Sequence, residues 1–214
     1  MRSVTAWLSI RAVLAIGCAV VSTSISTSAR AAETVRAVWN VQELYLPYFG
    51  LTTHYSCDGL RDRVRDMLKE LGVRGDFLVT VPGCIELSGP SPHPTARIIL
   101  ANAVPATDEL AKALAADPKR AQLIAKLQKQ SKTTFSDEPF DAHAKRVRLY
   151  AKNNGASSVG SSGDCELLEQ MRRLVLPKLG AQVSNDDVSC TPHQGTVGNS
   201  SMDVDLLVAV PAKS

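Results

Sequence analysis

Residues 57–72 read CDGLRDRVRDMLKELG, and residues 165–180 read CELLEQMRRLVLPKLG. Each stretch begins with cysteine, ends with glycine and carries apolar residues at helical spacing between them. At an offset of 108 the identical pairs are Cys57/Cys165, Leu60/Leu168, Arg65/Arg173, Leu68/Leu176, Leu71/Leu179 and Gly72/Gly180. Self-similarity at a fixed spacing is typical of a duplicated structural unit. We therefore expect two copies of one unit in this chain.

The similarity continues on the C-terminal side of both stretches. Cys84 matches Cys190 at an offset of 106, and LANAVPA at 100–106 matches LLVAVPA at 206–212. A two-residue deletion after Gly180 accounts for the change of offset. We place the first copy at 32–106, the second at 142–214, and connecting helices and a linker at 107–141.

Each copy is predicted to fold as strand, helix, strand and strand. In the first copy, alternating and β-branched residues predict strands at 35–46, 77–81 and 97–104. Between them Leu60, Val64, Met67, Leu68 and Leu71 form one apolar helical stripe, which Gly72 ends.

The second copy predicts the same elements with small differences. Asp164 is the expected N-cap of its helix, Gly180 the expected stop, and Pro177 is expected to bend or shorten the last turn. Strands are predicted at 181–190 and 203–210.

Local capping signals predict two helices in the connecting segment. Thr107 is expected to cap a helix at 108–116, and Asp117-Pro118 begins another that runs to about residue 130. The predicted fold class is therefore α+β: internally duplicated β-α-β-β units form one mixed, largely antiparallel sheet. Neither half has much core alone, so we expect one compact domain with helices on one face of the sheet.

The first 31 residues have the layout of a cleaved secretory signal peptide. Arginines flank a short apolar run at 12–21, and Ala29-Arg30-Ala31 is a small-residue cleavage site before Ala32. The apolar run is too short to span a bilayer, so no transmembrane span is expected in the mature chain. We predict a periplasmic or secreted protein. The alternative is a lipoprotein anchored through Cys18.

Charge and composition exclude several classes of protein. The chain is 44% hydrophobic and 21% charged, which is a globular composition rather than a disordered one. Its formal net charge of +3 comes from Arg2, Arg11 and Arg30, all within the leader. Because the mature chain is neutral, we expect no attraction for nucleic acid. The chain contains no phosphate-binding, hydrolase or calcium-loop motif, so no cofactor is predicted.

Export leaves four cysteines, and an even number in an oxidising compartment predicts disulfides. The duplication favours pairing within each copy, as Cys57–Cys84 and Cys165–Cys190. Each bridge would close a loop of about 25 residues, worth about 3–4 kcal/mol in the chain-entropy account.

Histidines near these cysteines provide weak candidates for metal binding. His54-x-x-Cys57 and Cys190-x-x-His193 have ligand-like spacing, and His93 and His193 both follow a hydroxyl residue and a proline. Structural disulfides would consume the sulfurs, so turn-associated histidines are the simpler interpretation. A reactive thiol at a helix N-terminus is disfavoured for the same reason.

Clustered aromatic residues, Trp39, Tyr45 and Phe49, provide the best candidate for a binding surface, although a contribution of these rings to the core is the favoured interpretation, because the rest of the chain has few large aromatic side chains. Trp39, Val41, Tyr45 and Phe49 share odd-numbered positions of the first predicted strand, whereas Val38, Leu44 and Tyr48 share even ones. Successive strand residues face opposite sides. We therefore predict that one set is buried and the other at least partly exposed.

Three functional hypotheses remain open from the sequence. The first is a non-catalytic binding or adaptor protein that takes an envelope protein or a small ligand as its partner. The second is a periplasmic Zn- or Cu-binding protein, and the third is a small periplasmic hydrolase or thiol enzyme. The absence of a catalytic motif favours the first.

Overall fold

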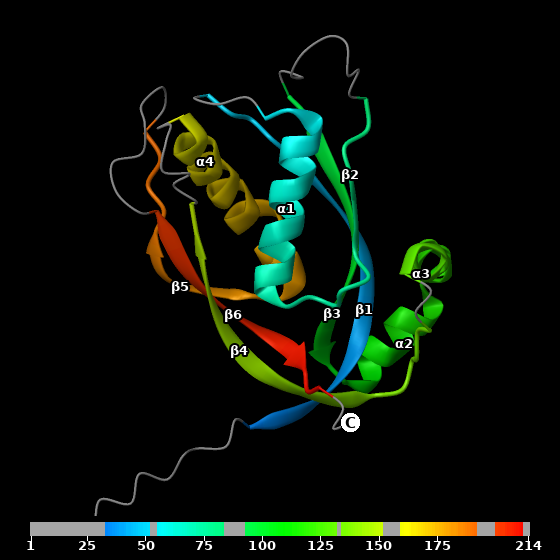
Figure 1. Cartoon of the computed structure of the whole chain (residues 1–214). Helices are drawn as coiled ribbons and strands as arrows, with labels where there is room; N and C mark the ends of the chain where they lie inside the picture. Colours follow the sequence, from blue (N-terminus) through cyan, green and yellow to red (C-terminus); the bar gives the residue numbers. More distant parts are fainter. Residues whose placement is uncertain are drawn as a thin grey trace, which may run out of the picture. The chain divides into compact units, whose positions relative to one another are not determined.

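The computed structural model describes residues 33–51, 55–83, 93–131, 134–151, 159–191 and 200–211, without the side chains of 159–162. They belong to one compact unit, Ala32–Ser214. In chain order (Figure 1) the elements are β1 (Thr34–Pro47), α1 (Cys57–Leu71), β2 (Leu78–Thr80), β3 (Thr95–Pro105), α2 (Asp108–Ala116), α3 (Pro118–Ser131), β4 (Phe140–Tyr150), α4 (Val159–Leu174), the 3-10 helix η2 (Leu176–Leu179), β5 (Gln182–Asp187) and β6 (Ser201–Ala209).

The strands form one six-stranded sheet in the order β2-β3-β1-β4-β6-β5. Every strand pairing among the described residues is antiparallel, so the predicted mixed sheet is wrong in that respect. We call β1–β3 with α1 the first half and β4–β6 with α4 the second half. In each half the first strand lies at the centre of the sheet, the last strand lies beside it, and the short strand lies at the edge. The centre is held by β1 and β4, which pair only over residues 34–37 and 140–143.

Equivalent backbone hydrogen bonds occur where the two central strands end. The Tyr48 N–H donates to the Pro94 carbonyl, and the Ala151 N–H donates to the Ser200 carbonyl, both at 2.9 Å. Helix α1 packs against β4 of the other half, and α4 packs against β1. The two halves therefore share one core rather than folding around two.

Helix α1 forms where the sequence predicts it. The Ser56 hydroxyl accepts a hydrogen bond from the Gly59 N–H, and Gly72 adopts the left-handed conformation with φ of 77° at the C-terminus. The predicted apolar stripe is completely buried in the main core. Thr107 and Asp117 likewise accept hydrogen bonds from the N–H groups of Leu110 and Lys119, as predicted for caps of α2 and α3.

Helix α4 differs from the prediction at its start. It begins at Val159, so Asp164 lies inside the helix and is not its N-cap. The Asp164 carboxylate instead accepts from Arg63 and Tyr55 of the other half. At the C-terminal end the helix stops at Leu174 and Pro177 lies in η2, which confirms the predicted shortening.

Helices cover both faces of the sheet, so the predicted arrangement on one face is wrong. Helices α1 and α4 bury the main core, whereas α3 packs on the opposite face of the first half (Figure 1). There Leu123 and Leu127 contact Val41, Ile99 and Ala101. The matching face of the second half carries Arg146–Asp205 and Arg148–Asp203 ion pairs between β4 and β6. Those charges suit a face that lies in water.

One of the two predicted disulfides lies completely within the described residues. Cys165 and Cys190 are joined, as predicted, across a separation of 25 residues. Cys57 is also disulfide-bonded, and its predicted partner Cys84 lies outside the described residues. No helix of the described part of the chain is long and apolar enough to cross a membrane.

Candidate functional site

A pocket of about 450 Å³ lies beside the end of β1, between that segment and α4. We call it the Phe49 pocket. Its lining residues are Phe49, Leu51, Glu166, Glu169, Gln170, Arg173, Leu174 and Cys190. This volume is within the range of small-molecule sites.

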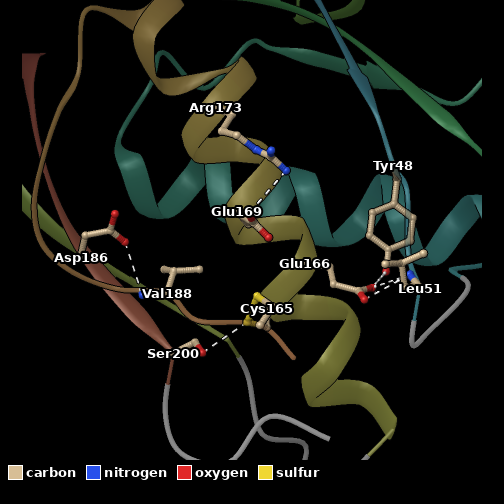
Figure 2. The surroundings of a disulfide bond; sticks show 10 residues. Tyr48, Leu51, Cys165, Glu166, Glu169, Arg173, Asp186, Val188 and Ser200 are labelled. Atoms are coloured by element: carbon tan, nitrogen blue, oxygen red, sulfur yellow. Dashed lines mark hydrogen bonds and ion pairs between the residues drawn. A yellow bond between two sulfur atoms is a disulfide. The ribbon is translucent and has the colours of Figure 1, made fainter. Parts of the chain in front are cut away.

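Buried side chains of α4 hold the backbone that follows β1. The Gln170 amide accepts from the Phe49 N–H at 3.2 Å and donates to the Phe49 carbonyl at 3.1 Å. The Leu51 N–H donates to both carboxylate oxygens of Glu166 at 3.1 Å, and the Tyr48 hydroxyl donates to Glu166 at 3.3 Å. Figure 2 shows Glu166 pointing from α4 toward Tyr48 and Leu51. These bonds satisfy backbone groups of the segment that follows β1 and fix one wall of the pocket.

The rim of the pocket carries large apolar side chains in contact with water. Phe49, Leu51 and Leu174 are between 41% and 56% exposed. Ligand sites usually combine apolar side chains with a small number of fixed polar groups, and this pocket contains both. The Phe49 ring also lies 5.3 Å from the His93 ring.

Three ionisable side chains line the pocket among the described residues. Glu166 is buried, whereas Glu169 and Arg173 form a partly exposed ion pair of 3.4 Å along the helix (Figure 2). Arg172, on the same helix, pairs instead with Asp186. The part of the lining that the structure describes therefore holds two carboxylates and one guanidinium.

The disulfide forms another part of the wall. Cys190 lines the pocket, while Cys165 is completely buried on α4, with its sulfur 3.3 Å from the Ser200 hydroxyl oxygen. Figure 2 shows Cys165 and Glu166 on different sides of α4. The bridge thus ties the segment after β5 to the helix that carries the polar floor.

A buried polar cluster adjoins this floor between α1 and α4. Arg63 pairs with Asp164 at 3.0 Å and donates to the Tyr150 carbonyl at 2.9 Å, and the Tyr55 hydroxyl donates to Asp164. Burial, followed by the nearby Asp164 carboxylate, raises the pKa of Tyr55, and burial with Glu166 raises the pKa of Tyr48. Both phenols therefore stay protonated and act as hydrogen-bond donors.

Trp39 belongs to a second pocket, also of about 450 Å³, at the other end of β1. Its ring stacks on Phe140 at 4.3 Å, and the Arg74 guanidinium lies 5.4 Å from its centroid. Because Phe140 and Arg74 both contact the indole ring, Trp39 has a clear packing role here.

The prediction that one set of this strand is buried and the other at least partly exposed holds only in part, because Val41 of the odd-numbered set is buried in the cluster with Leu123 and Leu127 of α3. Val38, Leu44 and Tyr48 are buried, whereas Tyr45 and Phe49 are exposed and Trp39 is partly buried. The structure does not unite the three candidate residues, because Trp39 and Phe49 line different pockets. Only Phe49 contributes to the pocket at α4.

Sequence reasoning missed the α4 side of this pocket. Glu166 and Gln170 are four residues apart and so share one helical face, but a polar face of a helix usually meets solvent. Their burial depends on the end of β1, more than a hundred residues earlier in the chain. No local signal could have found it.

The metal and thiol hypotheses gain no site from the described residues. His54 and His193 lie outside them, and His93 lies beside Phe49. Nowhere in the described ranges do three or more His, Cys, Asp or Glu residues gather as metal ligands. Cys57, Cys165 and Cys190 are all disulfide-bonded, and Cys165 is not at the N-terminus of α4.

Comparison with known proteins finds no matching family model, no matching curated protein and no matching solved structure.

Proposed function

We propose that this chain is an exported, disulfide-stabilised, non-catalytic binding protein whose ligand site is the Phe49 pocket. The observation that carries the proposal is that the pocket combines buried, hydrogen-bonded polar side chains with exposed apolar side chains. Buried Glu166 and Gln170 hold its wall through hydrogen bonds to backbone and to Tyr48, while large apolar side chains remain exposed at the rim. Apolar rim surface of this kind is stabilised when a ligand covers it.

The proposed export depends on two features of different origin. The first 31 residues have the charge, apolar core and cleavage site of a signal peptide. The Cys165–Cys190 bridge is of the kind that persists in oxidising compartments. Fusing residues 1–31 to a reporter enzyme that is active only outside the cytoplasm tests export; a silent fusion would contradict it.

We also propose that the two halves arose by internal duplication. The strand order is the same from both sheet edges, and left-handed glycines, Gly72 and Gly180, end the corresponding helices. The paired hydrogen bonds at Tyr48 and Ala151 support the same relationship. In this proposal the two copies later diverged in sequence. As a result, the Phe49 pocket lies on α4 of the second half, and helix α3 covers a face of the first half.

The binding proposal is tested with N-phenyl-1-naphthylamine, a neutral apolar dye that fluoresces when it leaves water. We expect saturable enhancement with one dye per chain. Phe49→Ser and Leu174→Ser should each weaken dye binding at least tenfold, because they remove rim surface. Tyr150→Ser is the matched control, since Tyr150 is an exposed aromatic residue outside the pocket. Equal dye binding by all four proteins would exclude this pocket.

A further inference from the structure

We infer that the Phe49 pocket selects apolar zwitterions, namely ligands with an ammonium group and a carboxylate on one carbon at the end of an apolar chain. α-Amino acids with apolar side chains have this chemistry. The inference depends on the proposed binding function and specifies the class of ligand. Two features of the pocket carry it: the adjacent, weakly held charges of Glu169 and Arg173, and the apolar rim beside them.

The polar side chains of the described lining have two different roles. Glu166 and Gln170 are buried and hold the wall through hydrogen bonds to the segment that follows β1. Glu169 and Arg173 are partly exposed and form an ion pair with each other (Figure 2). Within the part of the lining that the structure describes, this pair is therefore the polar feature that can meet a ligand.

The ion pair of Glu169 and Arg173 opens at small cost. Its oxygen and nitrogen lie 3.4 Å apart, farther than the roughly 2.8 Å of a charge-assisted hydrogen bond, and the side chains are 34% and 62% exposed. Exposed helical pairs of this kind contribute little to stability. A ligand with one charge would take one member of the pair and leave the other without a partner. A zwitterion supplies a partner to each: its ammonium group to Glu169, and its carboxylate to the forked N–H donors of Arg173.

The spacing of the two charges favours an α-amino acid over a ligand with distant charges. Glu169 and Arg173 are four residues apart on α4, so their side chains are neighbours on one face. In an α-amino acid both charged groups are bonded to the same carbon and can reach two neighbouring partners together. Because such a ligand has no net charge, the summed charge of its surroundings neither attracts nor repels it as a whole. Selection then depends on the local order of opposite charges.

The apolar rim determines the rest of the ligand. Phe49, Leu51 and Leu174 surround the same pocket that the ion pair lines, so one molecule can contact both. The apolar chain of the ligand would cover these side chains and remove them from water. A volume of about 450 Å³ suits a small ligand rather than a folded partner.

Competition against the bound naphthylamine dye tests this selection with four related ligands. They are racemic 2-aminooctanoate, octanoate, n-heptylammonium and 8-aminooctanoate, at neutral pH and below their micellar concentrations. Octanoate lacks the ammonium group of 2-aminooctanoate, n-heptylammonium lacks its carboxylate, and 8-aminooctanoate has the two charges at opposite ends. We expect 2-aminooctanoate to displace the dye at a concentration about tenfold or more below each of the others, which is the effect of one hydrogen bond to a charged group.

Variants of the ion pair assign the recognition to its two members. Glu169→Gln should reduce the advantage over octanoate to about threefold or less, and Arg173→Gln should do the same for n-heptylammonium, because neutral hydrogen bonds are weaker than charged ones. Glu169→Arg combined with Arg173→Glu should keep the preference, since the zwitterion can bind with its charged groups exchanged. Arg172→Gln is the matched control, because Arg172 lies on the same helix, pairs with Asp186 and is not among the described lining residues.

The outcomes distinguish this inference from the proposed function. Equal displacement by octanoate, n-heptylammonium or 8-aminooctanoate would overturn the selection of adjacent charges. A preference that survives both single variants of the pair, or is lost in the exchanged variant, would overturn the assigned recognition residues. In each of these cases, dye binding sensitive to Leu174→Ser would leave the binding proposal intact. Dye binding that is insensitive to both Phe49→Ser and Leu174→Ser would overturn the proposed function and this inference together.

Discussion

Arg63 of α1 and Asp164 of α4 form an ion pair of 3.0 Å between the two halves of the chain, and both side chains are more than nine-tenths buried. Arg63 also donates to the Tyr150 carbonyl at the end of β4, and Asp164 accepts from Tyr55. The pair therefore joins the halves beside the Phe49 pocket. The duplicated pattern does not repeat it, because Met171 occupies the position that corresponds to Arg63.

We expect Arg63→Met to destabilise the protein by about 3–5 kcal/mol, because it leaves the Asp164 carboxylate buried without its cation. Arg63→Met combined with Asp164→Leu should cost less than the sum of the two single changes. The control is Arg36→Met at the exposed Arg36–Asp141 pair, where the loss should be at most about 1 kcal/mol. Urea unfolding measures all four variants, and additive losses at the buried pair would contradict its coupling.

The two glycines that end α1 and η2 offer a matched comparison. Both have positive φ, 77° at Gly72 and 67° at Gly180, so alanine at either position should cost about 1–2 kcal/mol. A Cβ at Gly72 would lie 3.3 Å from Val208 Cγ1, whereas a Cβ at Gly180 would meet nothing within 4 Å. Gly72→Ala should therefore lower the unfolding midpoint further than Gly180→Ala. The reverse order would show that Val208 does not restrict this site.

Removing the Cys165–Cys190 bridge should lower stability by about 2–5 kcal/mol, because the unfolded chain regains the freedom of a 25-residue loop. The variant is Cys165→Ser with Cys190→Ser, in which the new hydroxyl at 165 can pair with Ser200. Thermal unfolding without reductant measures the change. An unchanged midpoint would mean that the bridge contributes nothing to stability.

Truncating Tyr48 should destabilise the protein far more than truncating Tyr45, three residues earlier. Tyr48 is completely buried, so Tyr48→Ala should cost about 3–5 kcal/mol. Tyr45 is 57% exposed, so Tyr45→Ala should change stability by no more than about 0.5 kcal/mol. Similar losses at both positions in chemical unfolding would contradict the burial of the even-numbered face.

Alkaline pH should destabilise the protein through its buried tyrosines. Burial and nearby carboxylates raise the pKa of Tyr48 and Tyr55 above the ordinary value of 10.0. Above pH 10 the unfolded chain loses these protons while the folded chain keeps them, so stability falls as pH rises. Each tyrosine contributes up to about 1.4 kcal/mol per pH unit.

Tyr55→Phe provides the control for this pH dependence, because phenylalanine has no phenolic proton to lose. Urea unfolding between pH 9 and 11, with absorbance at 295 nm reporting tyrosinate, should show a shallower decline for this variant. Identical slopes for the variant and the parent chain would exclude a contribution from Tyr55.

Much of the fold follows from local features of the chain. Helix α1 and its stop at Gly72, together with the caps at Thr107 and Asp117, were predicted correctly, because each depends on residues within a few positions of one another. The Cys165–Cys190 pairing was also predicted, because the repeated cysteines limit the possible connections. Of the candidate site, the sequence named only Phe49, and it did not determine which face of the first strand would be exposed.

Features that depend on distant residues could not be derived in this way. Helix α4 begins before Asp164, so the Asp164 carboxylate does not cap it. That carboxylate accepts a hydrogen bond from Arg63, about a hundred positions earlier in the chain. The polar face of α4 is buried because Glu166 and Gln170 accept hydrogen bonds from the backbone N–H groups of Leu51 and Phe49, which follow β1. Burying these polar groups is favourable only when their partners arrive together, and that depends on packing of the complete chain.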